Sequence, residues 1–320
     1  MSEKAIFERL GLLRLINRID PFKRTDGRPP ETFGGFVLWA LKGSYPLIGL
    51  GAVFSAMGGT LDVISAFLLG LVIDSVLNSE PGNVFGENAW LLFGSLVFFL
   101  MVRPLVFGAN ATKQHLFLQP KIGPQVNARL HRWTMGQSIS YFDNDFAGRL
   151  AQKQIQTSNA ISEVTVETIN TAFFALISVV SAAVLLSAID WRVASLLGIW
   201  AAIYFTLLRY FIPRVRAKAK IRANARSVIS GQLVDTITNM RTVKLFANRD
   251  HEDQAAINAM SDYRDAALEA GFVSVSFRTC LMFIGGLLPT VLIGTSILFW
   301  AQGSASAGQI AAVGAIALRL

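Results

Sequence analysis

Two charged side chains, Asp62 and Arg103, stand inside long apolar segments of the sequence. Ionisable residues at membrane depth are costly and commonly serve ligand binding or ion transfer, so these two are the first candidates for chemistry. Asp62 lies about 18 residues into the first apolar segment and Arg103 about 14 residues into the second. We therefore place the two charges at different depths and expect no direct pair between them. Each side chain instead faces a water-filled cavity or extends its charge to an interface.

Other residue types that carry chemistry are sparse. The three histidines, His115, His131 and His251, are far apart and show no metal-ligand spacing, so we expect no metal site. The single cysteine, Cys280, excludes a disulfide within the chain. The phosphate-binding pattern G-x-x-x-x-G-K-[ST] does not occur, so we expect no cofactor site and no ATP hydrolysis by that mechanism in these residues.

The composition is typical of a membrane protein, with 52% hydrophobic and 16% charged residues. Thr279–Leu318 contains no Asp, Glu, Lys or Arg, and Gly43–Leu61 and Thr168–Ile189 are shorter runs of the same kind. A span needs about 20 apolar residues. Buried helices of a large soluble protein are the alternative, but no soluble core requires an uncharged run this long. We predict an all-α, multi-pass membrane protein.

The positive charge marks one side of the membrane. The formal net charge is +8, yet the Lys and Arg residues cluster beside the apolar segments, as in cytoplasmic loops, and do not indicate nucleic-acid binding. Residues 1–30 are basic and contain no signal peptide, which predicts a cytoplasmic N-terminal segment. The turn Asn78–Asn88 has two Glu and no Lys or Arg, which suits the outer face.

Residues 31–44 are too short to span and carry Trp and Phe, so we interpret them as an interfacial "elbow" helix, the alternative being the start of the first span. Residues 45–320 hold five full spans and the beginning of a sixth near Gln309, within which the sequence stops. The helices that meet at Asn144 are about 55 and 45 residues long, or roughly 65–80 Å. Two helical hairpins must therefore project some 30–40 Å beyond a core of about 30 Å.

The two hairpin tips have distinct sequences. The first, Ser140–Leu150, places aromatic residues around an acidic turn, followed by Gly148-Arg149 at the start of a new helix. The second, Gly231–Arg249, ends in Val243-Lys244-Leu245-Phe246. Aromatic side chains at a projecting tip are suited to fill a groove on a partner protein.

The tips resemble those of ATP-binding cassette (ABC) exporters, which carry "FFD…G-R/K-L" after the second span and "G…E…VK-x-F" after the fourth. Gly303–Ile310 is similar to the family's "G-x-(T/S)-x-G-x-L/I" entry into the sixth span. Each motif is weak alone, but together they follow the family order over about residues 31–320. Two departures are Asp235, where the family usually has Glu, and the lack of an Asp near Thr157–Asn159.

The resemblance implies the six-span exporter fold of multidrug- and lipid-type exporters, with a short coupling helix at each tip. The implied coupling residues of the first tip are Tyr141, Phe142, Asp143, Asn144, Asp145, Phe146 and Gly148. Those of the second are Asp235, Thr238, Asn239, Arg241 and Val243. The implied partners are nucleotide-binding domains, which would carry ATP and Mg²⁺ and which the sequence lacks, together with a second transmembrane half in a homodimer or heterodimer.

The implied function is export of a small hydrophobic or amphipathic substrate across a bacterial inner membrane, with Asp62 and Arg103 as cavity candidates. Two alternatives stay open. A non-transporting scaffold or regulatory subunit would have no ATPase encoded with it. An unrelated channel or carrier would pass ions without nucleotide, although long cytoplasmic hairpins are typical neither of channels nor of most carriers.

Overall fold

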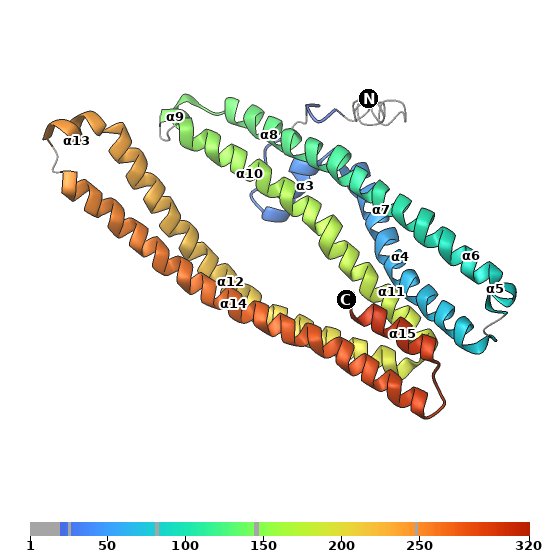
Figure 1. Cartoon of the computed structure of the whole chain (residues 1–320). Helices are drawn as coiled ribbons and strands as arrows, with labels where there is room; N and C mark the ends of the chain where they lie inside the picture. Colours follow the sequence, from blue (N-terminus) through green and yellow to red (C-terminus); the bar gives the residue numbers. More distant parts are fainter. Residues whose placement is uncertain (1–19, 25–26, 81–82, 144–146, 247–248) are drawn as a thin grey trace. The chain divides into compact units, whose positions relative to one another are not determined.

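The computed structural model describes residues 20–24, 27–80, 83–143, 147–246 and 249–320, and every regular element in these ranges is helical. The prediction of an all-α membrane fold is confirmed. The helices divide into two compact units (Figure 1). Unit 1 comprises residues 1–188 and 303–320, and unit 2 comprises residues 189–302.

Five of the described helices are long and apolar enough to cross a membrane: Tyr45–Asn78, Ala89–Met135, Leu150–Ile189, Trp191–Thr238 and Asp253–Ala301. The last four have 40 to 49 residues, which corresponds to about 60–74 Å. Large apolar side chains such as Leu100, Val184 and Phe283 are exposed on their surfaces. Exposure on this scale indicates a lipid environment, in which helices satisfy their own backbone groups.

Unit 1 begins with α3 (Phe33–Leu41), which a turn at Lys42–Ser44 separates from α4 (Tyr45–Asn78). Gly43 adopts φ +91° in this turn, a backbone conformation that glycine reaches without strain. The chain then reverses through α5 (Val84–Glu87). The next long helix consists of α6 (Ala89–Val97), η1 (Phe98–Val102), α7 (Arg103–Thr112), η2 (Lys113–Leu118) and α8 (Gln119–Met135), where η denotes a π-helical turn.

The short helix α9 (Ile139–Asp143) ends this arm, and the chain returns through α10 (Ala147–Glu167), η3 (Thr168–Phe173) and α11 (Phe174–Ile189). Figure 1 shows α8 and α10 as a hairpin with α9 at its tip, at the opposite end of unit 1 from α5. Gln154 Nε2 donates to both oxygens of Asn127, at 3.2 and 3.0 Å, and Ser158 Oγ donates to the Gly123 carbonyl at 2.6 Å. These bonds hold the hairpin together.

A small core joins α3 to the same hairpin. Ala40 and Leu41 are buried against Leu118, Ile122 and Val126. Arg129 of α8 donates to the carbonyls of Trp39 and Ala40 at 2.7 Å each, and also to that of Lys42. Since these are carbonyls that the end of a helix leaves unpaired, Arg129 caps the C-terminus of α3. The placement of α3 at a membrane surface stays a prediction.

In unit 2, α12 (Trp191–Thr238) and α14 (Arg249–Ala301) lie antiparallel and are joined by α13 (Met240–Phe246). Asp190 caps α12 by accepting from the Arg192 amide at 2.7 Å. Trp200 Nε1 donates to the Ile284 carbonyl at 2.8 Å, the rings of Phe211 and Phe277 stack 5.2 Å apart, and Lys218 pairs with Glu269 at 2.6 Å. These contacts join the two helices from Trp200 to Lys218 of α12.

The last helix of unit 1, α15 (Ala307–Ala317), packs closely on α4. Asp74 accepts from Ser306 Oγ at 2.5 Å and from the Gly308 amide at 2.6 Å, so a carboxylate neutralises the N-terminus of α15. A Cβ atom built on Gly70 would stand 2.5 Å from the Gly308 carbonyl oxygen and 2.8 Å from Ala312 Cβ. Glycine therefore permits the close approach of α4 and α15.

We expect Gly70→Ala to lower the thermal stability of the protein, because the added methyl group must push α15 away at a cost of about 1–3 kcal/mol. Gly94→Ala in α6 is the matched control, since its Cβ would meet nothing within 4 Å. Alanine favours a helix over glycine by about 0.5–1 kcal/mol, so the control should be neutral or stabilising. Melting in detergent measures both, and equal melting temperatures would contradict the packing described.

Candidate functional site

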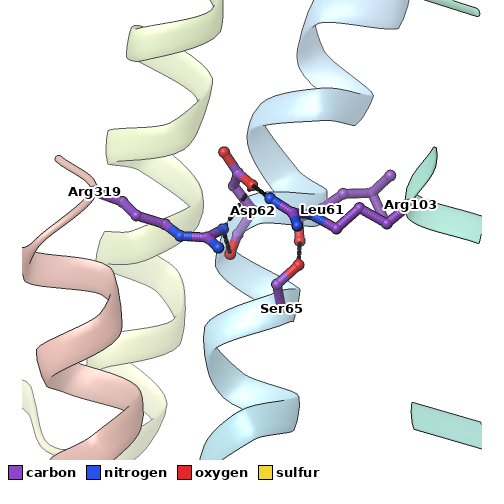
Figure 2. Close-up of polar contacts among 5 residues, drawn as sticks. All are labelled: Leu61, Asp62, Ser65, Arg103 and Arg319. Carbon is purple, nitrogen blue, oxygen red and sulfur yellow. Dashed lines mark hydrogen bonds and ion pairs between the residues drawn. The ribbon is translucent and has the colours of Figure 1, made fainter. Parts of the chain in front are cut away.

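Asp62 and Arg103 lie side by side and join α4 to α7 (Figure 2). Arg103 Nη2 donates to Asp62 Oδ1 at 3.1 Å. The expectation that the two charges lie at different depths was wrong, because their positions were counted from opposite ends of antiparallel helices. Counted from the α5 end, Asp62 is about 24 Å along α4 and Arg103 about 21 Å along its helix. At about 51 Å, α4 exceeds the thickness of the hydrocarbon core, so its first residue does not mark the membrane surface.

Arg319 is a third member of this group, and the sequence analysis missed it. Its Nη1 donates to Asp62 Oδ1 at 2.6 Å and to the Asp62 carbonyl at 3.3 Å. A signal was available, because Arg319 is the first charge after the uncharged run that ends at Leu318. It lies about 18 Å from the first residue of α15, a depth similar to that of Asp62.

The Asp62 cluster (Asp62, Arg103 and Arg319) has one carboxylate for two guanidinium groups. Its formal charge is therefore positive by one. The side chain of Asp62 is 21% exposed, and charges attract more strongly where water is partly excluded. Arg103 also stands over the ring of Phe107, 5.3 Å from its centroid, and its Nε is buried without a partner among the described residues. The excess charge can accept an additional anionic or polar group.

A cavity of about 100 Å³ adjoins Asp62 and Arg319, with Phe174, Ser178 and Ile316 on its walls. Within the described ranges the hydroxyl of Ser178 is buried without a hydrogen-bond partner. The cavity is therefore roomy and polar enough for water, which needs a few partners in a space of this kind. Asp62 and Arg319 line this space and Arg103 does not, so the expectation that Asp62 and Arg103 face a water-filled cavity stays a prediction.

A larger groove of about 860 Å³ lies along the α8–α10 hairpin, and most of its lining residues are polar. Its lining includes Gln119, Asn127, His131, Gln154, Asn159 and Glu163. The sequence analysis did not identify it, because the groove arises from facing sides of two helices that are distant in sequence. Among the residues described, no three His, Cys, Asp or Glu side chains gather as a metal site would require.

The first hairpin tip is organised by aromatic contacts. The Tyr141 ring meets Trp133 edge-on at 6.1 Å and Phe142 at 5.4 Å. The described residues of this tip form α9 (Ile139–Asp143), and Gly148 lies in α10. Three candidate residues, Asn144, Asp145 and Phe146, lie outside the described residues. Ile139 and Phe142 are exposed, so the tip presents an apolar surface.

The second tip differs from the expected single helix over Asp235–Val243. Asp235 and Thr238 belong to the last turn of α12, and Asn239 interrupts the helix before α13, which contains Arg241 and Val243. Asn239 itself leaves the helical conformation, with φ −94° and ψ 17°, while its side chain donates to Asp235 Oδ1 at 3.0 Å. Ile237 and Leu245 are exposed beside it, so this tip is also apolar.

The model of the family described as "ABC transporter transmembrane region" matches residues 48–318. A protein of Haemophilus influenzae described as an uncharacterized ABC transporter ATP-binding protein is 27% identical over 312 residues. That match covers 95% of this chain and 50% of the other protein, so the chain spans about half the length of the curated relative it matches.

We expect Asp62→Leu to lower the melting temperature, because it leaves two guanidinium groups without their carboxylate. In the double variant Asp62→Leu/Arg103→Leu part of this loss should be recovered, which gives a coupling energy of about 1 kcal/mol for a partly exposed pair. Glu80→Gln, at an exposed carboxylate near the end of α4, is the control and should change little. Strictly additive effects of the two substitutions would contradict the pairing.

Proposed function

Because the chain belongs to the ABC transporter transmembrane region family, we propose that it is the membrane-spanning half of an ATP-driven exporter. In this proposal it moves a small hydrophobic or amphipathic substrate out of the cytoplasm by alternating access. The protein resides in a bacterial inner membrane with its N-terminus and both hairpin tips in the cytoplasm. The alternatives, a scaffold subunit or an unrelated channel, are not favoured by any contact described above.

The observation that carries the proposal is helix length. The two arms that flank α9 and the two that flank α13 each reach about 60–74 Å, while the hydrocarbon core is about 30 Å thick. Their tips therefore stand well outside the membrane and carry exposed apolar side chains, among them Phe142 and Leu245. An apolar surface at such a distance from lipid requires a protein partner.

We propose that the tips contact nucleotide-binding domains, which bind ATP and Mg²⁺. The transporter is then a dimer of two transmembrane halves. ATP binding brings the nucleotide-binding domains together, and the hairpins transmit this movement to the spans. A conformational change of this kind requires that ATP bind the two states with different affinity. In this proposal the Asp62 cluster lies at the depth of the substrate cavity and adds a charged group to its apolar lining.

The test uses the full-length protein with its nucleotide-binding domain, reconstituted in liposomes. We expect vanadate-sensitive ATP hydrolysis that lipids or hydrophobic amphiphiles stimulate. Tyr141→Ala/Phe142→Ala should remove the stimulation, since loss of aromatic anchors weakens docking by about 30-fold or more. Trp90→Ala is the matched control, because Trp90 is an exposed aromatic residue at the opposite end of unit 1.

Three results would contradict the proposal. Stimulated hydrolysis that persists in the double variant would remove the role of the first tip. A full-length protein without ATPase activity would support the scaffold alternative. Ion flux through liposomes without nucleotide would support the channel alternative.

A further inference from the structure

Lys113 is a buried cation whose partners are all neutral. Its side chain is almost completely shielded, with a relative exposure of 4%. The ammonium Nζ donates to the Gly51 carbonyl at 3.1 Å, to Ser55 Oγ at 3.2 Å and to Asn170 Oδ1 at 3.0 Å. Because an ammonium has three donors, these bonds satisfy it completely. One side chain thus connects α4, the long helix through α7 and α8, and the helix through α10 and α11.

The same position carries two π-helical turns. Lys113 is the first residue of η2, and Asn170 lies in η3. Counted from the α5 end, Lys113 is about 36 Å and Asn170 about 29 Å along their helices, close to the far edge of a core of about 30 Å. π-helical turns are rare and often mark functional positions. Both arms of the first hairpin therefore change their winding at one level, where a hydrogen bond joins them.

The packing around the ammonium is close but incomplete. A Cβ on Gly51 would lie 3.3 Å from Ile169 Cγ2, 3.4 Å from Leu118 Cδ1 and 3.6 Å from Lys113 Cδ, so a larger residue would press against the Ile169 side chain. In contrast, Asn170 Nδ2 is buried and has no partner among the described residues. An unsatisfied buried amide is a cost that a rigid core would avoid, and it indicates that these bonds can rearrange.

Separate sets of contacts stabilise the structure on the two sides of Lys113. Toward α9, α8 and α10 are joined by Gln154 and Ser158, and α3 is capped by Arg129. Toward α5, Thr60 and Ser181 hydroxyls stand 3.3 Å apart, linking α4 to α11.

The first turn of α4 packs on the hairpin side, where Ser44 Oγ donates to Gln125 at 2.6 Å and Leu47 lies in the core with Ile122. The contacts between the long helices thus form two sets that meet at the level of η2 and η3, and α4 takes part in both.

We propose that Lys113, together with the π-helical turns η2 and η3, forms a joint at which the α8–α10 hairpin tilts against α7 and α11. The three hydrogen bonds of Lys113 hold the tilt of the present structure, and a tilt in the other direction exchanges them for bonds to water. The joint is a property of unit 1 and does not depend on the exporter proposal.

Distances between pairs of spin labels, measured by pulsed electron paramagnetic resonance in nanodiscs, test the joint. Exposed positions His131 on α8 and Val184 on α11 lie on opposite sides of it, in a background with Cys280→Ser. Lys113→Met keeps the side-chain length but removes all three hydrogen bonds. We expect it to shift or broaden the distance distribution between positions 131 and 184.

Two further label pairs each lie on one side of the joint: His131 with Ile155 in the hairpin, and Leu69 with Val184 in the spans. Their distributions should not change in Lys113→Met. His115→Gln, at an exposed residue of the same turn η2, is the matched control and should leave all three pairs unchanged. A distribution between positions 131 and 184 that is identical in Lys113→Met and the parent protein would overturn the joint, as would equal broadening of all three pairs.

Ser55→Ala keeps the proposal testable if Lys113→Met does not fold, because it removes a single acceptor. Loss of one bond to a charged donor should accelerate hydrogen exchange of the backbone amides in η2 and η3 by about ten-fold. Amides at the centres of α8 and α11 should exchange as in the parent protein. Unchanged exchange in η2 and η3, or a uniform acceleration along both helices, would overturn the proposal.

Discussion

The thickness of the hydrocarbon core is the constraint on which the rest of the structure depends. Backbone groups in lipid have no water to bind, so each crossing must be a helix that satisfies its own hydrogen bonds. A crossing uses about 20 residues, yet four of the described helices have 40 to 49. The excess residues can only continue outward, and two antiparallel hairpins with apolar tips are the result. Helix length thereby determines where a partner protein can bind.

The same medium explains how the chain treats its charges. An isolated ion in lipid is expensive, so each intramembrane charge must find partners or water. Asp62 does so with Arg103 and Arg319, and leaves one positive charge beside a cavity. Lys113 does so without any carboxylate, by means of three neutral oxygens. An ion pair resists separation because both partners suffer, whereas neutral acceptors can be exchanged for water at lower cost. The contacts of the Asp62 cluster therefore favour a fixed structure, whereas those of Lys113 favour a conformational change.

Sequence alone was sufficient for the features that depend on composition and length. The charge-free run Thr279–Leu318 and the aromatic tip around Tyr141 led to an all-α membrane fold and to the family. The sequence alone was insufficient for features that depend on the register between helices or on the conformation of single residues. The Asp62–Arg103 pair requires that both depths be counted from one end, and the break between α12 and α13 lies in the backbone conformation of one residue, Asn239. The π-helical turns have no sequence pattern, because an extra residue in a turn leaves the composition unchanged.

Unit 1 is built with opposite mechanical properties at its two ends. Near α5, Gly70 allows α4 and α15 to touch, and Asp74 ties their ends through the Ser306 hydroxyl and the Gly308 amide. Toward α9, by contrast, the hairpin meets the spans through two π-helical turns and an ammonium with replaceable partners. A force applied at the α9 tip therefore meets its least resistance at Lys113, well before it reaches α15. Movement of the tip would be converted first into a tilt of the hairpin, and only then into separation of the spans that hold Asp62.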